Sequence, residues 1–384
     1  MLERDSLDVA EGPPALHAFP ATHRSASSAV ISSVHDNPSG DRCSGVGTGP
    51  VSAMRAIPTS VMIVVSGGLL LLTTPSVVAV AQEAPAAGDR MVQVIPGTDV
   101  SLTLSRIPGG TTLLGSAEDE VGRELDEGPQ RTIVLQPFWM SIHEVTHDQF
   151  AIFRSRRLDS DTSTAGDGSF DADAVSRPSP PYEDPAHGMG QGNHPASGMT
   201  QWAALQYARW LSLKTGRLFR LPTEAEWEHA CRAGTGDTSP FADDIDRSAW
   251  YAANSGDAFQ PVGQKAPNAW GLYDMAGNVA EWTLDEYTAN AYELIGHEAI
   301  DPWVRPASEH PRTVRGGAFD DEPAQLRCAD RLESTLRWKR RDPQLPKSRW
   351  WNTDSPHVGF RLVSPDREYT IEEIRAYWQD LLQS

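Results

Sequence analysis

The chain has 384 residues and a formal net charge of -19, and 39% of its residues are hydrophobic. This length allows one large domain or two ordinary ones. Nucleic acid is not expected as a partner, because its binding depends on Lys and Arg replacing the counterions of phosphates, and 52 acidic residues oppose 33 basic ones.

Residues 54–81 have the layout of a secretory signal peptide. The segment begins with Met54 and Arg55, continues with an apolar run over 61–72 and ends in small residues, which predicts cleavage after Ala81. A helix needs roughly 20 apolar residues to cross a bilayer, and this run is shorter. We therefore expect export to the periplasm or the exterior. The alternative is a membrane anchor over 57–80, which is the one reason to expect a membrane contact.

The segments on either side of the signal are low in apolar periodicity. Residues 1–53 are rich in Ser, Pro, Gly and His, which predicts a disordered leader. Because a signal peptide normally stands at the very N-terminus, our hypothesis is that translation starts at Met54 and not at Met1. Residues 82–90 form an Ala- and Pro-containing linker, and one domain is expected over 91–384.

The first part of this domain predicts strands, one helix and a loop. Alternating apolar residues predict strands within 91–110, a short strand near 111–114 and another strand over 131–146. Thr146 is placed to cap a helix over 147–157. The following stretch, 158–195, is dense in Asp, Ser, Pro and Gly and predicts a long surface loop.

The strongest helix signals lie in the middle and at the end of the chain. Thr200 and Gly216 mark the start and the end of one helix. Thr223 with Glu226 forms a capping box for a second helix, and a similar box opens an amphipathic helix over 370–383. From residue 238 onward Trp, Gly, Asn and Pro predict coil. Two late strands, 313–319 and 357–363, are expected to pair with each other.

Cysteine usage narrows the chemistry. The sequence has three cysteines, and Cys43 precedes the expected cleavage site. Export leaves Cys231 and Cys328, an even pair in an oxidising compartment, so that a disulfide is the leading interpretation. A reactive thiol or a metal ligand at Cys328 remains as the alternative at this point.

Five segments resemble, in order and spacing, the formylglycine-generating enzyme family, also called sulfatase-modifying factors. They are GMTQWAALQYARWLS, RLPTEAEWEHACRAG, NAWGLYDMAGNVAEWT, VRGGAF and GFRLV, within residues 105–363. The resemblance implies an α+β, C-type-lectin-like fold with a small antiparallel sheet, two main helices and much ordered coil. The family's enzymes oxidise a cysteine of a sulfatase peptide to formylglycine, using oxygen and copper held by two thiolates.

The sequence departs from the family at the positions that carry this chemistry. The copper-binding cysteine pair has no counterpart, because FDDEPAQL follows the RGG turn. The family's serine after RGG is Ala318, and a family tryptophan is replaced by Ala280. The resemblance implies a disulfide between Cys231 and Cys328. Copper is not expected, since copper(I) selects soft thiolate ligands.

Three functions follow as alternatives. The first is an exported binding or scaffold domain whose ligand is an unknown peptide, protein or glycan. The second is a formylglycine-generating oxidase that modifies sulfatases through another metal arrangement. The third is a different reaction on the same fold, because a fold does not fix a function. The first is favoured, since the thiol pair is missing and no cluster of Ser, His and Asp is evident.

The resemblance also implies bound calcium. In DMAGNVAE, the carboxylates of Asp274 and Glu281 and the peptide carbonyls of Gly277 and Val279 match the family's calcium loop. Oxygen ligands on a tight glycine-containing loop are what Ca²⁺ prefers. The alternative is a turn in which both carboxylates cap backbone amides.

Weaker candidates complete the set. A second calcium site would use Asn254 and the Ser255 carbonyl, but the loop is shorter than the family's. The acidic triplet 320–322 either binds a hard cation or is a solvated loop, and the latter is favoured. Arginines interspersed with tryptophans would form a basic and aromatic pocket or, more commonly, lie scattered on the surface: Arg217, Arg220, Arg337, Trp338, Arg340, Arg349 and Trp350.

Overall fold

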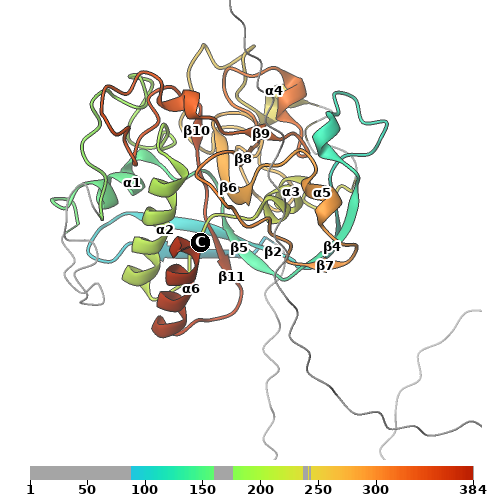
Figure 1. The fold of residues 1–384 in the computed structure, drawn as a ribbon, viewed down its shortest axis with the longest axis horizontal. Coiled ribbons are helices and arrows are strands. Elements are labelled where there is room, and N and C mark those ends of the chain that lie inside the picture. The colour runs from blue at the N-terminus through green and yellow to red at the C-terminus, as the bar shows by residue number, and fades with distance from the viewer. Residues whose placement is uncertain (1–87, 160–175, 237–240, 242–243, 384) are drawn as a thin grey trace, which may run out of the picture. The chain divides into compact units, whose positions relative to one another are not determined.

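The computed structural model describes residues 88–159, 176–236, 241 and 244–383 (Figure 1). The expected leader, the signal peptide and most of the linker lie outside these residues. Within them, no helix combines the length and the apolar character that crossing a bilayer requires.

The first sheet joins both ends of the domain. It has four antiparallel strands in the order β1-β2-β5-β11. Their bounds are β1 Arg90–Val94, β2 Ser101–Ile107, β5 Phe138–Ser141 and β11 Val363–Pro365. Leu102 and Leu104, two residues apart on β2, are buried, as alternation along a half-buried strand requires.

The second sheet corrects two predictions. Its order is β10-β6-β8-β9, with β6 Ala280–Glu286, β8 Arg312–Arg315, β9 Leu332–Glu333 and β10 Val358–Gly359. We predicted coil at β6, which is wrong: Ala280, Trp282 and Leu284 alternate with polar residues along this strand, and both of its faces are buried. The two late strands do not pair with each other: β8 pairs with β6 and β9, whereas 357–363 divides between β10 here and β11 in the first sheet.

The third sheet has the order β3-β4-β7, with β3 Gly110–Leu114, β4 Arg131–Leu135 and β7 Ala299–Ile300. The single strand predicted over 131–146 is in fact two strands, β4 and β5, in different sheets. Pro137 lies between them, and proline cannot donate a ladder hydrogen bond.

The predicted helices are present with their predicted caps. They are α1 His147–Arg154, α2 Gln201–Thr215, α3 Glu224–Arg232 and α6 Ile371–Gln383. Thr146, Thr200 and Thr223 cap the first three, and Gly216 ends α2 with φ 69°. Shorter helices follow the loops: 3₁₀ turns Leu125–Glu127, Pro323–Leu326 and Leu336–Lys339, and α4 Ile245–Ser248 and α5 Ala291–Leu294.

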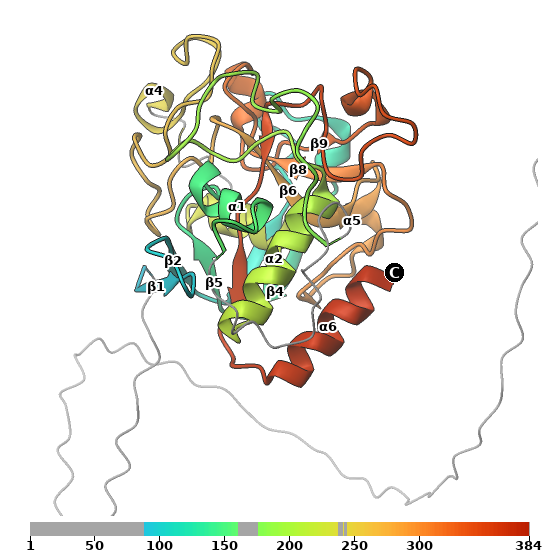
Figure 2. The same ribbon diagram turned by 90° about the vertical axis from the view of Figure 1, so that its left-hand side faces the viewer.

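The main core lies where α1, α2 and α6 meet the first two sheets. Aromatic rings of α1 and α2 pack together, with Phe153 and Tyr207 5.9 Å apart and Tyr207 and Phe360 5.6 Å apart between ring centroids. Helix α6 lies alongside α2 in both views (Figures 1 and 2). A second buried cluster surrounds Trp227 on α3. The site described below is built at the edge of this second cluster.

Candidate functional site

The two cysteines of the domain form a disulfide. Cys231 lies in the last turn of α3, and Cys328 follows the 3₁₀ turn Pro323–Leu326. Their Cα atoms are 5.7 Å apart, and both residues are buried. The predicted disulfide is therefore confirmed, and the thiol and metal-ligand interpretations of Cys328 do not apply to this oxidised form.

A buried arginine anchors the segment that carries Cys328. Arg315 closes β8, and its guanidinium donates to the carbonyl oxygens of Cys328 at 2.6 Å and Ala329 at 3.0 Å. It also pairs with Glu228 at 2.5 Å and Glu224 at 3.2 Å on α3. Despite burial, the phenol and carboxylates around Arg315 raise its pKa, so it stays charged. The arginine of the RGG motif thus has a structural role.

The RGG turn closes the loop in which the family carries its copper ligands. Gly317 has φ 66°, and a Cβ there would lie 2.6 Å from the Leu326 side chain and 2.7 Å from the Gln325 carbonyl, so glycine is required. The Asp321 carboxylate accepts a hydrogen bond from the Ala318 amide at 2.9 Å. Burial raises the pKa of Asp321. Its role as a turn cap supports the loop interpretation of the acidic triplet.

His357 is a neighbour of this loop that sequence reasoning missed. Burial lowers the pKa of its imidazole, while Asp320 and Asp321 oppose that shift. Its ring lies 5.8 Å from Trp338, which lies 5.4 Å from Trp282. No sequence signal connects the histidine with the acidic triplet. Throughout the described ranges, no three His, Cys, Asp or Glu residues are grouped so that they could hold a metal ion.

The structure gives Glu281 a partner that the calcium hypothesis did not foresee. Both carboxylate oxygens accept hydrogen bonds from Arg361, each at 2.6 Å, and Oε2 also accepts from Trp227 Nε1 at 2.7 Å. The side chains of Glu281 and Arg361 are 1% and 0% exposed. Because its charge and its oxygens are already engaged, Glu281 is the weaker of the two predicted carboxylate ligands.

A different carboxylate lies next to Asp274. The side chains of Asp274 and Glu144 are buried and interact directly. Asp274 Oδ2 accepts from the Gly263 amide at 2.7 Å and Glu144 Oε1 from Asn278 Nδ2 at 3.0 Å. The remaining oxygens, Asp274 Oδ1 and Glu144 Oε2, have no hydrogen-bond partner. These two buried oxygens fit either a proton shared between the two carboxyl groups or a hard cation.

Electrostatics at this pair disfavour two charged carboxylates. Burial, reinforced by the negative charge of Glu281, raises the pKa of Asp274 to about 6. The pKa of Glu144 is raised well above its usual range, first by burial and then by the Asp274 charge. Two adjacent carboxylates withdrawn from water need either a proton or a cation between them. Glu144, of the HEVT segment, is the neighbour of Asp274 that sequence analysis did not single out.

The other predicted ligands lie on turns. Gly277 has φ 74°, and a Cβ there would lie 2.0 Å from the Trp250 carbonyl, so only glycine permits this approach. Val279 is buried beside it. Asn254 Oδ1 accepts from the Tyr251 amide at 3.0 Å, and the Ser255 carbonyl accepts from Gln260 at 2.8 Å. Both groups of the second calcium set are thus bonded within their own loop, and that site stays a prediction.

The predicted basic and aromatic set is dispersed. Arg220 pairs with Glu226 at 2.6 Å, and Arg217 donates to Ser364 at 2.8 Å. Arg349 instead stacks on Trp202, with its guanidinium carbon 3.5 Å from the ring centroid. The scattered arrangement is thus the correct one.

Three small sheets, capped helices and long ordered coil around a disulfide define an α+β domain of the C-type-lectin-like kind. The model of the "Sulfatase-modifying factor enzyme 1-like domain" matches residues 98–364. The chain belongs to this family, as its motifs predicted.

Relatives with known names fall into two groups. The formylglycine-generating enzyme of Thermomonospora curvata is 28% identical over 69% of this chain and 94% of its own. The serine/threonine-protein kinase pkn1 of Chlamydia caviae is 36% identical over 59% of this chain, which spans about a third, 34%, of that relative. PvdO from Pseudomonas aeruginosa matches in structure with a TM-score of 0.56 and 25% identity, over 73% of this chain and 100% of PvdO.

Proposed function

We propose that the mature chain is an exported member of its family that does not oxidise cysteine with copper and acts as a calcium-stabilised binding or scaffold domain. The observation that carries the proposal is the disulfide between Cys231 and Cys328. It uses every cysteine of the domain, because the third cysteine of the sequence, Cys43, precedes the expected cleavage site. Copper(I) then lacks the thiolates that it selects.

The environment of the RGG turn supports the same proposal. Ala318 and Ala280 are fully buried and offer neither a hydroxyl nor an aromatic wall. The Asp321 carboxylate is bonded within its own turn, and carboxylates are hard ligands that do not suit copper(I). The loop after the RGG turn is therefore better suited to a protein surface without a metal than to a copper centre that carries out oxidation.

Calcium is proposed at Glu144 and Asp274, with the carbonyls of Gly277 and Val279 as further candidates. The support is the pair of buried, unpartnered carboxylate oxygens. Bound calcium would neutralise two negative charges that burial otherwise disfavours, and a ligand bound by the native state alone stabilises it by mass action.

One experiment tests the loss of chemistry. The purified mature protein is incubated with a sulfatase-type cysteine peptide with and without copper, beside the Thermomonospora curvata relative as a positive control. We expect no aldehyde product under either condition. An aldehyde product that persists in the Cys328→Ser variant would overturn the proposal.

The second candidate is an oxidase that works through another metal arrangement. The observation that favours it is the match to a formylglycine-generating enzyme over 94% of that relative's length. The same assay, repeated with other divalent metals, separates the two functions.

A further inference from the structure

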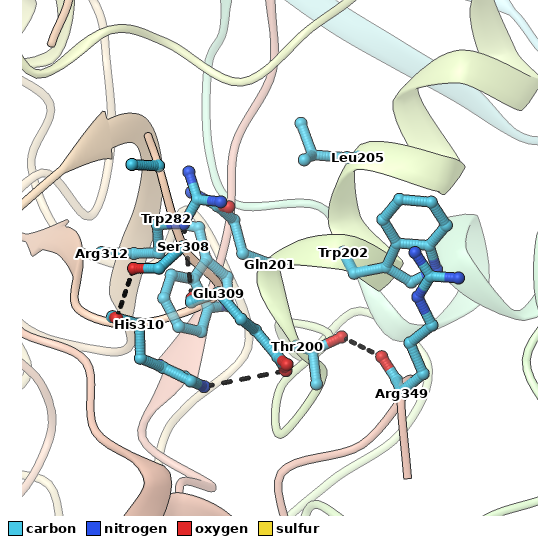
Figure 3. A pocket seen from close by; sticks show the side chains of 11 residues that line it. Thr200, Gln201, Trp202, Leu205, Trp282, Ser308, Glu309, His310, Arg312 and Arg349 are labelled. Carbon is cyan, nitrogen blue, oxygen red and sulfur yellow. Dashed lines mark hydrogen bonds and ion pairs between the residues drawn. The ribbon is translucent and has the colours of Figure 1, made fainter. Parts of the chain in front are cut away.

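A cavity of about 320 Å³ lies at the N-terminal end of α2 (Figure 3). Its walls come from the start of α2, from the loop 307–310, from the first residue of β8, Arg312, from Trp282 on β6 and from Arg349. None of the residues of the disulfide, the RGG turn or the Glu144 and Asp274 pair lines it. Its volume is at the lower end of the range of about 300–1,000 Å³ that small-molecule pockets occupy.

Arg312 is a cation of this cavity without a direct ion pair within the described residues, although Glu286, Glu309 and Asp285 lie near enough to act on its charge. Its Nε donates to the Glu309 carbonyl at 3.3 Å, and no carboxylate in the described part of the chain lies within ion-pair distance of it. Burial lowers the pKa of its guanidinium to about 10, although Glu286 and Glu309 oppose that shift. A charge that is withdrawn from water without a partner is unfavourable, and a bound anion would relieve this cost.

The acid on the cavity wall is already neutralised. The Glu309 carboxylate forms an ion pair with Lys339, whose side chain is 7% exposed. The Lys339 ammonium also holds the pKa of Glu309 below its usual range, against the effect of burial. Glu309 is thus engaged by Lys339, while Glu286, the cross-strand partner of Arg312, forms no ion pair with its guanidinium, which keeps donors available to a ligand.

His310 adds an unpartnered polar atom. Its side chain is 10% exposed, its Nδ1 is 2.7 Å from Ser334 Oγ, and its Nε2 makes no hydrogen bond. Figure 3 shows this nitrogen directed along the cavity wall toward Glu309, and the distance to Glu309 Oε1 is 3.9 Å. A buried ring nitrogen without a hydrogen bond indicates a missing partner.

Flat and apolar surfaces complete the walls. Trp282 and Leu205 line the cavity, and Trp202 lies under the Arg349 guanidinium. Arg349 is exposed and makes no ion pair within the described residues. The positive end of the α2 dipole adds to the field of the two arginines.

We propose that this cavity binds a small organic anion that carries a carboxylate on a flat or apolar body, with the carboxylate at Arg312 and the body against the tryptophans. Guanidinium groups bind carboxylates through two parallel hydrogen bonds, which gives orientation as well as affinity. This ligand class would give the proposed binding domain its ligand, and only that link to function rests on the proposed function.

The test uses 3-phenylpropionate as the probe and its amide as the neutral match. Isothermal titration calorimetry on the mature protein should show binding of the acid at least tenfold tighter than binding of the amide. Arg349→Gln, at an exposed position, should weaken binding of the acid severalfold, and Arg312→Gln should abolish it. Arg337→Gln removes the same charge from an exposed position outside the cavity and should leave the affinity unchanged.

Each outcome decides the matter. Equal binding of acid and amide, or no binding of the acid at 10 mM, overturns the inference. Equal weakening by Arg337→Gln and Arg349→Gln shows a general charge effect and overturns it as well. Inorganic sulfate that competes as strongly as the acid shows a simple anion site and overturns the proposed ligand class. An aldehyde product in the oxidase assay would overturn the proposed function and leave this result standing, so the two failures are distinguishable.

Discussion

Replacing Glu281 by glutamine separates its pairing with Arg361 from a role in calcium binding. The substitution removes the charge opposite a guanidinium that is 0% exposed, and two 2.6 Å contacts lose their ionic partner. The guanidinium would keep the carbonyls of Ser141 at 3.2 Å and Tyr273 at 3.0 Å, which carry no full charge, and the weaker attraction of the Glu144 and Asp274 carboxylates. Breaking a buried pair on one side costs about 3–5 kcal/mol. In a domain of this size that lowers the melting temperature by roughly 10 °C.

The assay is thermal unfolding by circular dichroism, in EDTA and in calcium. We expect Glu281→Gln to lower the melting temperature equally in both, so that the shift caused by calcium is retained. The double variant with Arg361→Met should regain part of the loss, because no unpaired charge then remains. If Glu281→Gln left the melting temperature in EDTA unchanged and removed the calcium shift, Glu281 would be a cation ligand and our reasoning would be wrong.

Three further predictions use stability measurements. Mass spectrometry without reductant should detect the peptides of Cys231 and Cys328 joined by a disulfide. The double variant Cys231→Ala and Cys328→Ala should lose about 4–5 kcal/mol of the free energy of unfolding, because the bond links residues 97 positions apart. Free alkylation of both thiols in the folded protein would contradict this prediction. Calcium should raise the melting temperature of the wild type but not of Asp274→Asn or Glu144→Gln, and a wild type that melts identically in EDTA would eliminate the site. Burial raises the pKa of Asp330 to about 7, against the effect of nearby guanidinium groups, whereas the unfolded value is about 3.9. The native state therefore binds more protons between about pH 4 and 7, and this contribution to stability is lost as the pH rises through that window. Guanidinium denaturation at pH 5 and pH 8 should show a smaller loss for Asp330→Asn than for the wild type, and an equal loss would refute the assignment.

The helices could be predicted from the sequence because their signals are local. Thr223 and Glu226 lie three residues apart, and the side chain of each accepts a hydrogen bond from the backbone amide of the other. The whole interaction is therefore contained in a short stretch of sequence. The strand β6 was missed although its apolar residues alternate with polar ones, because the Trp-, Gly- and Asn-rich stretch around it predicted coil and its partner strands lie elsewhere in the chain. What local sequence does not show is that the polar residues Glu281, Thr283 and Asp285 are buried as well, because their burial depends on these distant partners.

The same distinction applies to the site. The family motifs identified the disulfide, since the resemblance specified which two cysteines pair. The spacing of DMAGNVAE favoured Glu281 as a cation ligand, but Arg361 reaches it from 80 residues away. Glu144 is separated from Asn278, its hydrogen-bond partner, by 134 residues. Buried polar residues that are far apart in sequence cannot be recognised as partners from the spacing of nearby residues, because only the fold brings them together.

The disulfide bond joins Cys231 and Cys328, which are 97 residues apart in sequence, and so closes a covalent ring in the chain. Strands β6 and β8 both belong to this ring. A protease that cuts once between the two cysteines would open the ring without releasing either fragment. A nicked molecule and an intact one would therefore migrate as one band until a reductant is added, so gels of this protein should be run in both ways.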